Sequence, residues 1–272
     1  RPGRGLREQH DEGVEELHAL DHGGGAMVGW GWVVLAGDMI LRAGTLGSAL
    51  AFVAGAAMVT PVGLAYAELT SALSRAGGVV SFTYVGMGTL ASYVCGWTLV
   101  LAYLAVCAFE AVALPTVLGY LFPRFDAGYL YAVADSPVYA SWILTGVLGA
   151  LFIGYINYRG IRLASFVQWT ASFLLLAVGL AFFIPGNLTG DLHKLLPYFT
   201  DWSGYFRVVI MTPFLFLGFD VIPQVAEEVK VPFRAVGKLI LFAIFLALSW
   251  YVLVQWTVGL NLEGHALEGL DL

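Results

Sequence analysis

Two carboxylates stand inside apolar stretches of the sequence and are the residues best placed to do chemistry. Glu110 lies between LAVCAF and AVALP, and Asp220 follows the run VVIMTPFLFLGF. An ionised carboxylate deep in a bilayer costs roughly 3 kcal/mol or more unless it is paired, so such residues usually have a function. Asp220 could hold a substrate amine, gate its passage or carry a coupling proton; the alternative is a structural cap for N–H groups near Ile222 and Gln224. Glu110 could carry a proton, or could be a neutral side chain hydrogen-bonded to a neighbouring helix.

Two apolar segments are too short to cross a membrane as one helix. GGGAMVGWGWVVLAG occupies residues 23–37, and VVIMTPFLFLGF occupies residues 208–219. A helix needs about 20 residues to cross the hydrocarbon core. Glycine permits unwinding and Pro223 removes a backbone donor, so both segments favour broken helices whose backbone groups face a solute. Such a pair is typical of a transporter binding site near the bilayer midplane, whereas the alternative is that the glycines serve close helix packing.

The composition requires a membrane environment. The 272 residues are 59% hydrophobic and 12% charged, with a mean hydropathy of +0.81, far from the values of soluble domains. The formal net charge of −6 and the lack of clustered Lys and Arg argue against a nucleic-acid partner. Cys95 and Cys107 show no metal or disulfide spacing, and the sequence has no H-E-x-x-H or G-x-S-x-G motif. We therefore expect no metal, no cofactor and no enzymatic activity.

Five further segments are long and apolar enough to cross a bilayer unaided. They comprise residues 47–67, 90–109 with a continuation to 122, 138–156, 163–184 and 239–260. With the short segments as spans one and six, the chain has seven predicted spans, between a polar tail at residues 1–24 and an outer end at residues 261–272. Nine of the 13 Lys and Arg residues fall on the side of the N-terminus. This bias predicts a cytoplasmic N-terminus in the cell membrane.

Four stretches together resemble the amino acid-polyamine-organocation superfamily of permeases. In chain order they read GAMVGWGW, AYAELTSALSRAGG, INYRGIR and FLGFDVIPQVAEEVKVPFRAVGKL, and they spread from about Gly25 to Leu239. The resemblance implies an all-α integral membrane protein with an inverted-repeat transporter fold, in which helices one and six are discontinuous. Residues 25–186 would form the first five-helix repeat, and residues 203–260 the start of a truncated second repeat. About seven of about twelve spans would be present, without the eighth and tenth.

The resemblance also implies a substrate site made largely by the backbone. A substrate carboxylate would bind N–H groups of span one, and a substrate ammonium would bind carbonyl groups of spans one and six, beside Asp220. By motif position the site consists of Met27, Gly29, Trp30, Gly31, Phe214, Leu217, Gly218 and Phe219. The outer half of span one begins near Trp30, and its positive N-terminal end suits an anion. Phe214 and Trp30 would add apolar or cation–π walls, unless they are ordinary packing residues.

One segment departs from the family pattern, and another excludes one of the family's routes for a coupling proton. DEGVEELHALDHGGG carries acids where relatives have an apolar half-helix, and six acids fall among residues 8–21. That segment cannot cross lipid, so we expect the 272 residues to insert into a membrane without transporting. Span five, residues 163–184, has no ionisable residue, which excludes a proton route through a lysine there.

The predicted function is secondary active transport of amino acids or related organic amines by alternating access, with the substrate held at broken helices one and six. The coupling ion would be a proton, carried by Glu110 or Asp220, or a sodium ion. The alternative is a membrane sensor or accessory protein that binds a solute without moving it, which the long acidic tail favours. Asp38 and Arg42, four residues apart at the outer end of span one, are expected to form an ion pair.

Overall fold

The chain is helical through nearly all of its described part. The computed structural model describes residues 29, 31–73, 77–122, 125–133, 136–224 and 233–262. The helices are α2 Gly31–Ala43, α3 Thr45–Leu73, α4 Gly78–Leu121, α5 Ala140–Arg159, α6 Ile161–Thr189, α7 Trp202–Leu215, α8 Val221–Gln224 and α9 Phe233–Asn261. A 3-10 helix, η1 Leu192–Leu195, and an antiparallel hairpin of strands β1 Tyr129–Val133 and β2 Ser136–Tyr139 lie in the connections.

Five of the described helices, α3, α4, α5, α6 and α9, are long and apolar enough to cross a membrane. They coincide with the five segments predicted to cross unaided, which are helical except at residues 122, 138 and 139. Four of them extend beyond the predicted start, whereas the predicted start at residue 138 is wrong by two residues because β2 ends at Tyr139. The apolar side chains of α4, α5 and α6 are largely exposed, as Leu90 is on α4 and Tyr158 on α5. Exposed apolar surface of this kind suits contact with lipid.

α4 is bent near its beginning. Gly88 has a φ of 83° and a ψ of −175°, outside the helical range, and it divides the helix into a short first part and a long second part. A positive φ is readily adopted by glycine, which has no Cβ to clash with the backbone. Ser92 donates a hydrogen bond across the bend to the carbonyl of Val80 at 2.8 Å. The bend therefore turns the first part of α4 back against the second.

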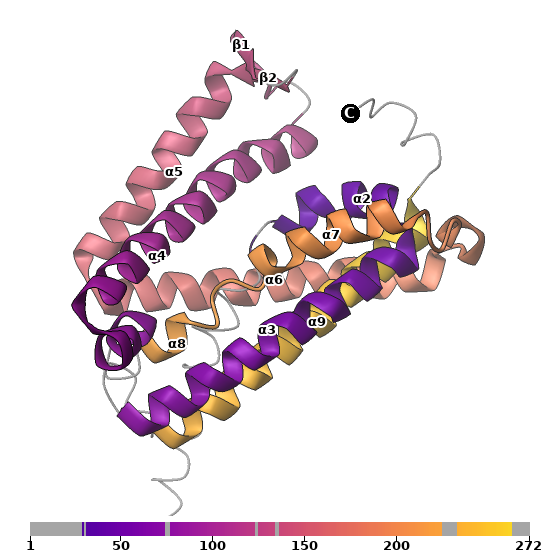
Figure 1. The fold of residues 1–272 in the computed structure, drawn as a ribbon. Coiled ribbons are helices and arrows are strands. Elements are labelled where there is room, and N and C mark those ends of the chain that lie inside the picture. Colours follow the sequence, from indigo (N-terminus) through magenta and orange to yellow (C-terminus); the bar gives the residue numbers. More distant parts are fainter. Residues whose placement is uncertain are drawn as a thin grey trace, which may run out of the picture.

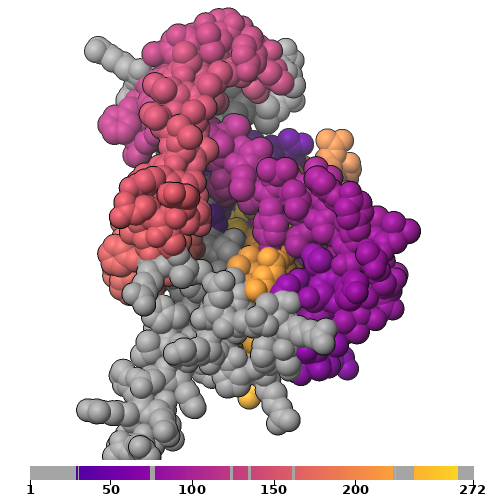
Figure 2. Space-filling model, turned by 90° about the vertical axis from the view of Figure 1, so that its left-hand side faces the viewer, coloured from indigo at the N-terminus to yellow at the C-terminus, as the bar shows by residue number. Residues whose placement is uncertain are grey.

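The helices form two groups that meet around α6 and α8. α3 and α9 run side by side along their lengths, and α2 and α7 lie against them (Figure 1). α4 and α5 form a second pair that diverges from the first and ends at the hairpin. From the α4 side, orange residues of the α7–α8 region are visible between purple and magenta residues of α4 (Figure 2). The interruption between α7 and α8 therefore faces α4.

The core lies between α3, α7 and α9. Phe52 stacks on Tyr251 with ring centroids 4.8 Å apart and an interplanar angle of 10°, and Phe216 meets Tyr251 edge-on at 5.9 Å. All three side chains are at most 2% exposed. Aromatic pairs in these arrangements contribute about 0.5–1.5 kcal/mol beyond their buried area. This cluster holds the end of α7 in place.

α6 packs on α9 through small residues. A Cβ on Gly179 would overlap the ring of Trp250, and one on Gly186 would meet the methyl group of Thr257 at 2.5 Å. Asn187 donates a hydrogen bond to the Thr257 hydroxyl at 2.9 Å. Small residues and interhelical hydrogen bonds are the usual means of helix association in lipid, where burial of apolar surface gives no driving force.

Candidate functional site

The backbone between α7 and α8 leaves the helical path just before Asp220. α7 contains Pro213 and ends at Leu215, and Gly218 has a φ of 122° before α8 begins at Val221. The carbonyl of Leu215 accepts a hydrogen bond from the Tyr251 hydroxyl of α9 at 3.2 Å. A carbonyl near a helix end has lost its intrahelical partner, and here a side chain from another helix replaces that partner.

Glycines allow the beginning of α2 to approach α4 and α7 closely. A Cβ on Gly31 would lie 3.2 Å from both the Phe109 ring and the Leu215 side chain. A Cβ on Gly29 would fall inside van der Waals contact with Oε1 of Glu110. The carboxylate of Glu110 therefore occupies the space that a side chain at residue 29 would need.

A small cavity lies among these helix ends, with a volume of about 30 Å³. It is lined by Gly29, Gly31, Val106, Phe109, Glu110, Phe214, Leu215, Leu217 and Tyr251. This volume holds one or two water molecules. The cavity brings together four residues of the predicted substrate site, Gly29, Gly31, Phe214 and Leu217, with the predicted proton carrier Glu110.

Four lining residues were not predicted from the sequence. Phe109 directly precedes Glu110, and Val106 lies one helical turn before it. Their closeness to Glu110 in the sequence could have identified both as residues of the same site. Leu215 lies within the predicted segment 208–219, between two predicted residues. Tyr251 on α9 has no such signal, because it lies in a long apolar run without Asp, Glu, Lys, Arg or His.

Asp220 belongs to a second polar cluster that joins the α7–α8 turn to α4. Its side chain is 5% exposed. Oδ2 accepts hydrogen bonds from the Tyr103 hydroxyl at 2.6 Å and from Nε2 of Gln224 at 3.2 Å, and Oδ1 accepts one from the N–H of Gly218 at 3.2 Å. Nε2 of Gln224 also donates to the Tyr103 hydroxyl at 3.3 Å. Both oxygens of the buried Asp220 carboxylate therefore have hydrogen-bond donors, as buried polar groups require.

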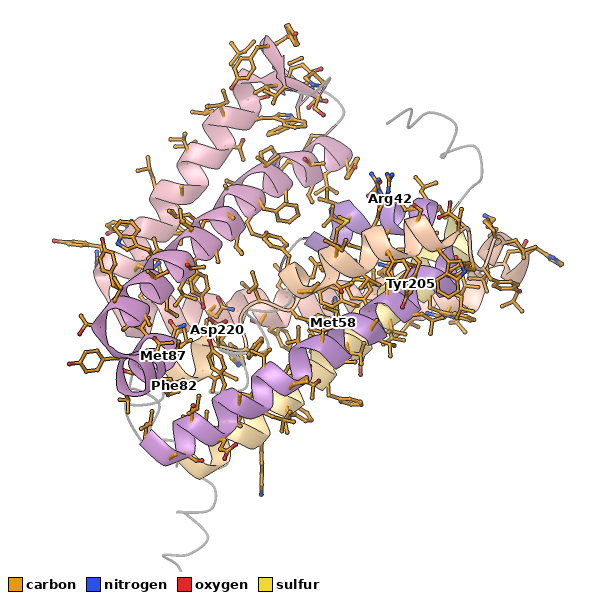
Figure 3. The ribbon with its side chains drawn as sticks, viewed as in Figure 1. Arg42, Met58, Phe82, Met87, Tyr205 and Asp220 are labelled. Atoms are coloured by element: carbon orange, nitrogen blue, oxygen red, sulfur yellow. The ribbon has the colours of Figure 1, made fainter. Side chains whose placement is uncertain are left out.

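This second cluster lies apart from the lining of the cavity. Figure 3 shows Asp220 beside the bent first part of α4, toward Phe82 and Met87. Phe219 packs edge-on against Tyr66 of α3, with ring centroids 5.7 Å apart. The residues that line the cavity do not include Gly218, Phe219 or Asp220.

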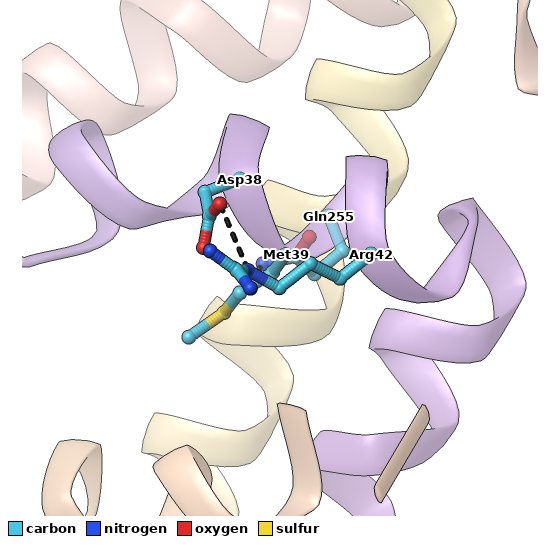
Figure 4. Close-up of polar contacts among 4 residues, drawn as sticks. All are labelled: Asp38, Met39, Arg42 and Gln255. Atoms are coloured by element: carbon cyan, nitrogen blue, oxygen red, sulfur yellow. Dashed lines mark hydrogen bonds and ion pairs between the residues drawn. The ribbon is translucent and has the colours of Figure 1, made fainter. Parts of the chain in front are cut away.

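Three further sequence predictions concern the beginning and the C-terminal end of α2. Met27 and Trp30 lie outside the described residues. Asp38 and Arg42 form the predicted ion pair, with 2.7 Å between Oδ2 and Nε (Figure 4). The same close-up shows Gln255, whose Nε2 donates to the Met39 sulfur at 3.8 Å. The ion pair is partly exposed, so its contribution to stability is small.

The apolar helices define a multi-pass integral membrane protein. Among known families, the chain belongs to that of the amino acid permeases, because the family model described as "Amino acid permease" matches residues 23–261. This match confirms the resemblance to amino acid-polyamine-organocation permeases. Amino acid transport by a membrane permease is accordingly the class of function that the comparisons support.

Three similar proteins illustrate the range of the family. The aspartate-proton symporter of Bacillus subtilis (strain 168) is 28% identical over 86% of this chain and 45% of its own length. The branched-chain amino acid permease of the same organism is 29% identical, over 88% of this chain and 53% of its own length. Cationic amino acid transporter 4 of Mus musculus is 28% identical, over 90% of this chain and 40% of its own length. The chain thus spans about half the length of the relatives it matches.

Proposed function

We propose that the protein is a secondary transporter of amino acids or related organic amines in the cell membrane, with a cytoplasmic N-terminus. It works by alternating access around a site between the beginning of α2 and the end of α7. These two helices are the described parts of discontinuous spans one and six in an inverted-repeat fold.

The observation that carries this proposal is that two helix ends of opposite polarity meet at one cavity. Gly31 begins α2, and Phe214 and Leu215 end α7. The N-terminal end of a helix carries about half a positive charge and the C-terminal end about half a negative charge. A zwitterionic amino acid, or an amine beside the end of α7, matches this arrangement.

The remaining residues of the proposed site continue the same two segments. Met27 and Trp30 precede α2, and Gly218 and Phe219 follow α7. Asp220 and Glu110 are the two candidate carriers of a coupling proton, because each is a carboxylate inside a membrane-spanning region. Sodium is the alternative coupling ion.

Substrate entry requires the cavity to open. Its volume of about 30 Å³ is far below the roughly 300 Å³ or more of ordinary ligand pockets. The rings of Phe109 and Phe214 meet edge-on with centroids 5.6 Å apart and separate α4 from α7 at this point. We propose that movement of this aromatic pair opens the site during alternating access.

The relatives leave the substrate open, because their names refer to aspartate, branched-chain amino acids and cationic amino acids. One of them is named a proton symporter, which supports a proton rather than sodium as the coupling ion.

Uptake into liposomes tests the proposal. The full-length protein that contains these 272 residues would be reconstituted, and uptake of radiolabelled amino acids and amines would be measured with a proton gradient, a sodium gradient or neither. We expect saturable uptake that collapses when the proton gradient is dissipated. Saturable binding without uptake or exchange would instead identify a sensor or accessory protein, and neither binding nor uptake would refute both functions.

A further inference from the structure

The hairpin of β1 and β2 presents apolar side chains on both of its faces. All five residues of β1 are exposed, and Tyr129, Leu130, Tyr131 and Val133 are each at least half exposed. Successive residues of a strand point to opposite faces, so neither face of β1 is covered. Neither strand contains a charged residue. A run of exposed apolar residues without charge is unfavourable in water and indicates contact with something less polar.

The hairpin is fixed to the beginning of α5. The N–H of Ala140 donates a hydrogen bond to the carbonyl of Gly128 at 2.8 Å. The Ser141 hydroxyl accepts one from the N–H of Ala127 at 3.2 Å. α5 has 20 residues, which is about 30 Å of helix and equals the thickness of the hydrocarbon core. Because the hairpin adjoins one end of α5 (Figure 1), it lies at one boundary of a membrane that α5 crosses.

The backbone of the hairpin limits how deep it can lie. β1 and β2 form a two-stranded sheet, so each strand has one edge of N–H and C=O groups without a partner strand. The hydrocarbon core offers such groups no hydrogen bonds, whereas water reaches them among the lipid headgroups. The apolar side chains disfavour bulk water and the backbone edges disfavour the hydrocarbon core. The headgroup layer satisfies both.

Aromatic residues at this end of α5 are of the kind that membranes hold at their surface. Tyr129 packs edge-on against Tyr139, with ring centroids 6.2 Å apart, and Tyr139 packs against Trp142 at 5.8 Å. Nε1 of Trp142 donates a hydrogen bond to Oδ1 of Asp126, an exposed carboxylate, at 2.8 Å. Tyr and Trp are enriched at the headgroup level because their rings are apolar and their polar atoms can meet water.

We propose that the hairpin is an interfacial anchor, which lies in the headgroup layer and binds the lipid surface through its apolar side chains. It continues the exposed apolar surface of α4 and α5, which suits contact with lipid. An anchor joined to the first residues of α5 sets the depth of that helix in the bilayer. The proposal concerns the position of the hairpin and holds whether or not the protein transports amino acids.

Spin labels measure the depth of the hairpin. Ala132→Cys and Val133→Cys would be labelled one at a time in the full-length protein, with Cys95→Ala, Cys107→Ala and any other cysteine replaced. The two positions pair with consecutive residues of β2, so their side chains lie on opposite faces. The protein would be reconstituted into vesicles of phosphatidylcholine and phosphatidylglycerol. Collision rates with oxygen and with a water-soluble nickel chelate give the depth, on a scale set by spin-labelled lipids.

We expect both labels to lie between the headgroup level and about 10 Å below it, the depth range of segments that lie on a membrane surface. Leu148→Cys, in the middle of α5, is the reference for the hydrocarbon core and should lie about 15 Å below the boundary. Size-exclusion profiles in detergent would verify that each labelled protein is folded.

A pair of tyrosine variants tests which side chains hold the hairpin. Tyr129→Ser combined with Tyr131→Ser should move the deeper label outward by about 5 Å or more, because binding at the interface scales with the apolar area buried there. Tyr158→Ser removes an exposed tyrosine at the opposite end of α5. This control should leave the depth of both labels unchanged.

Depths outside the headgroup layer would overturn the proposal. A label in bulk water would show that the hairpin projects from the membrane, and a label as deep as the one at residue 148 would place it in the hydrocarbon core. Labels that neither oxygen nor the nickel chelate reaches would show that protein covers the hairpin, either another part of the full-length chain or a second copy. An unchanged depth in the double tyrosine variant would refute anchoring by these rings.

Discussion

Asp220 and Glu110 are both carboxylates in apolar surroundings, yet their environments differ. Asp220 accepts hydrogen bonds from two side chains and one backbone N–H. Glu110 lies against Gly29 and lines a cavity. A change at Asp220 therefore alters the hydrogen bonds that join the α7–α8 turn to α4. A change at Glu110 alters the lining of the cavity.

We expect Asp220→Asn to fold and insert but to impair uptake of cationic or zwitterionic substrates. The amide keeps the shape, removes the charge, and places a donor where one carboxylate oxygen accepts hydrogen bonds. Loss of a hydrogen bond to a charged group costs about 1.5–3 kcal/mol, which corresponds to tenfold or more in rate or affinity. Initial uptake rates and binding constants in liposomes measure the effect. Wild-type values for both would end the functional role of Asp220.

The hydroxyl of Tyr103 can be tested separately from the charge of Asp220. Tyr103→Phe removes the 2.6 Å hydrogen bond between α4 and the α7–α8 turn and should lower the free energy of unfolding by about 1 kcal/mol, as interhelical hydrogen bonds in membranes do. Tyr93→Phe changes an exposed tyrosine of the same helix and is the matched control. Denaturant unfolding in detergent compares them; equal stability of the two variants would contradict the prediction.

At the scale of elements, the approach of α2 to α4 and α7 depends on glycine. Gly31→Val should abolish substrate binding, because the branched side chain would meet Phe109 and Leu215 and hinder approach of a ligand to the backbone. Gly37→Val on the same helix is the control, since nothing lies within 4 Å of a Cβ there. Binding measurements on both variants decide the matter. A change of less than about threefold for Gly31→Val, roughly 0.7 kcal/mol, would make this glycine a packing residue.

The packing of α6 on α9 gives a stability prediction. Gly179→Ala should destabilise the protein by about 1–3 kcal/mol, the usual range for overpacking, because its Cβ would overlap the Trp250 ring. Gly154→Ala on α5 meets nothing within 4 Å and should be neutral or stabilising, since alanine is the better helix former. Thermal unfolding in detergent measures both. Equal melting temperatures would show that α6 and α9 shift apart at no cost.

At the scale of the whole molecule, insertion and transport are separable. We expect the 272-residue chain to resist alkaline extraction from membranes, because five described helices have the length and apolarity to span them. We expect no substrate-specific flux from it, because it spans about half the length of related transporters. Uptake in liposomes by this chain and by the full-length protein makes the comparison. Saturable, stereoselective uptake by the 272 residues alone would refute the second expectation.

The five long apolar helices were predictable because their length and composition follow from local sequence. Hydrocarbon thickness sets a helix length that can be counted in any apolar run. Glu110 and Asp220 could be singled out from the sequence for a related reason, because a carboxylate in or beside an apolar run is unusual. The family resemblance then placed Gly29, Gly31, Phe214 and Leu217 in one site, and the cavity does bring these four together.

The bend at Gly88, the hairpin before α5, and the partners of the two carboxylates depended on tertiary structure. Tyr103 and Asp220 are 117 residues apart, and Tyr251 reaches Leu215 from a different helix. Helices in lipid are apolar on nearly every side, so no polar stripe marks the face that meets a neighbour. The sequence alone therefore determined which segments are long and apolar enough to cross a membrane and which residues are unusual there. Only the packing of rigid helices decided which of those residues share the cavity and which form the cluster around Asp220.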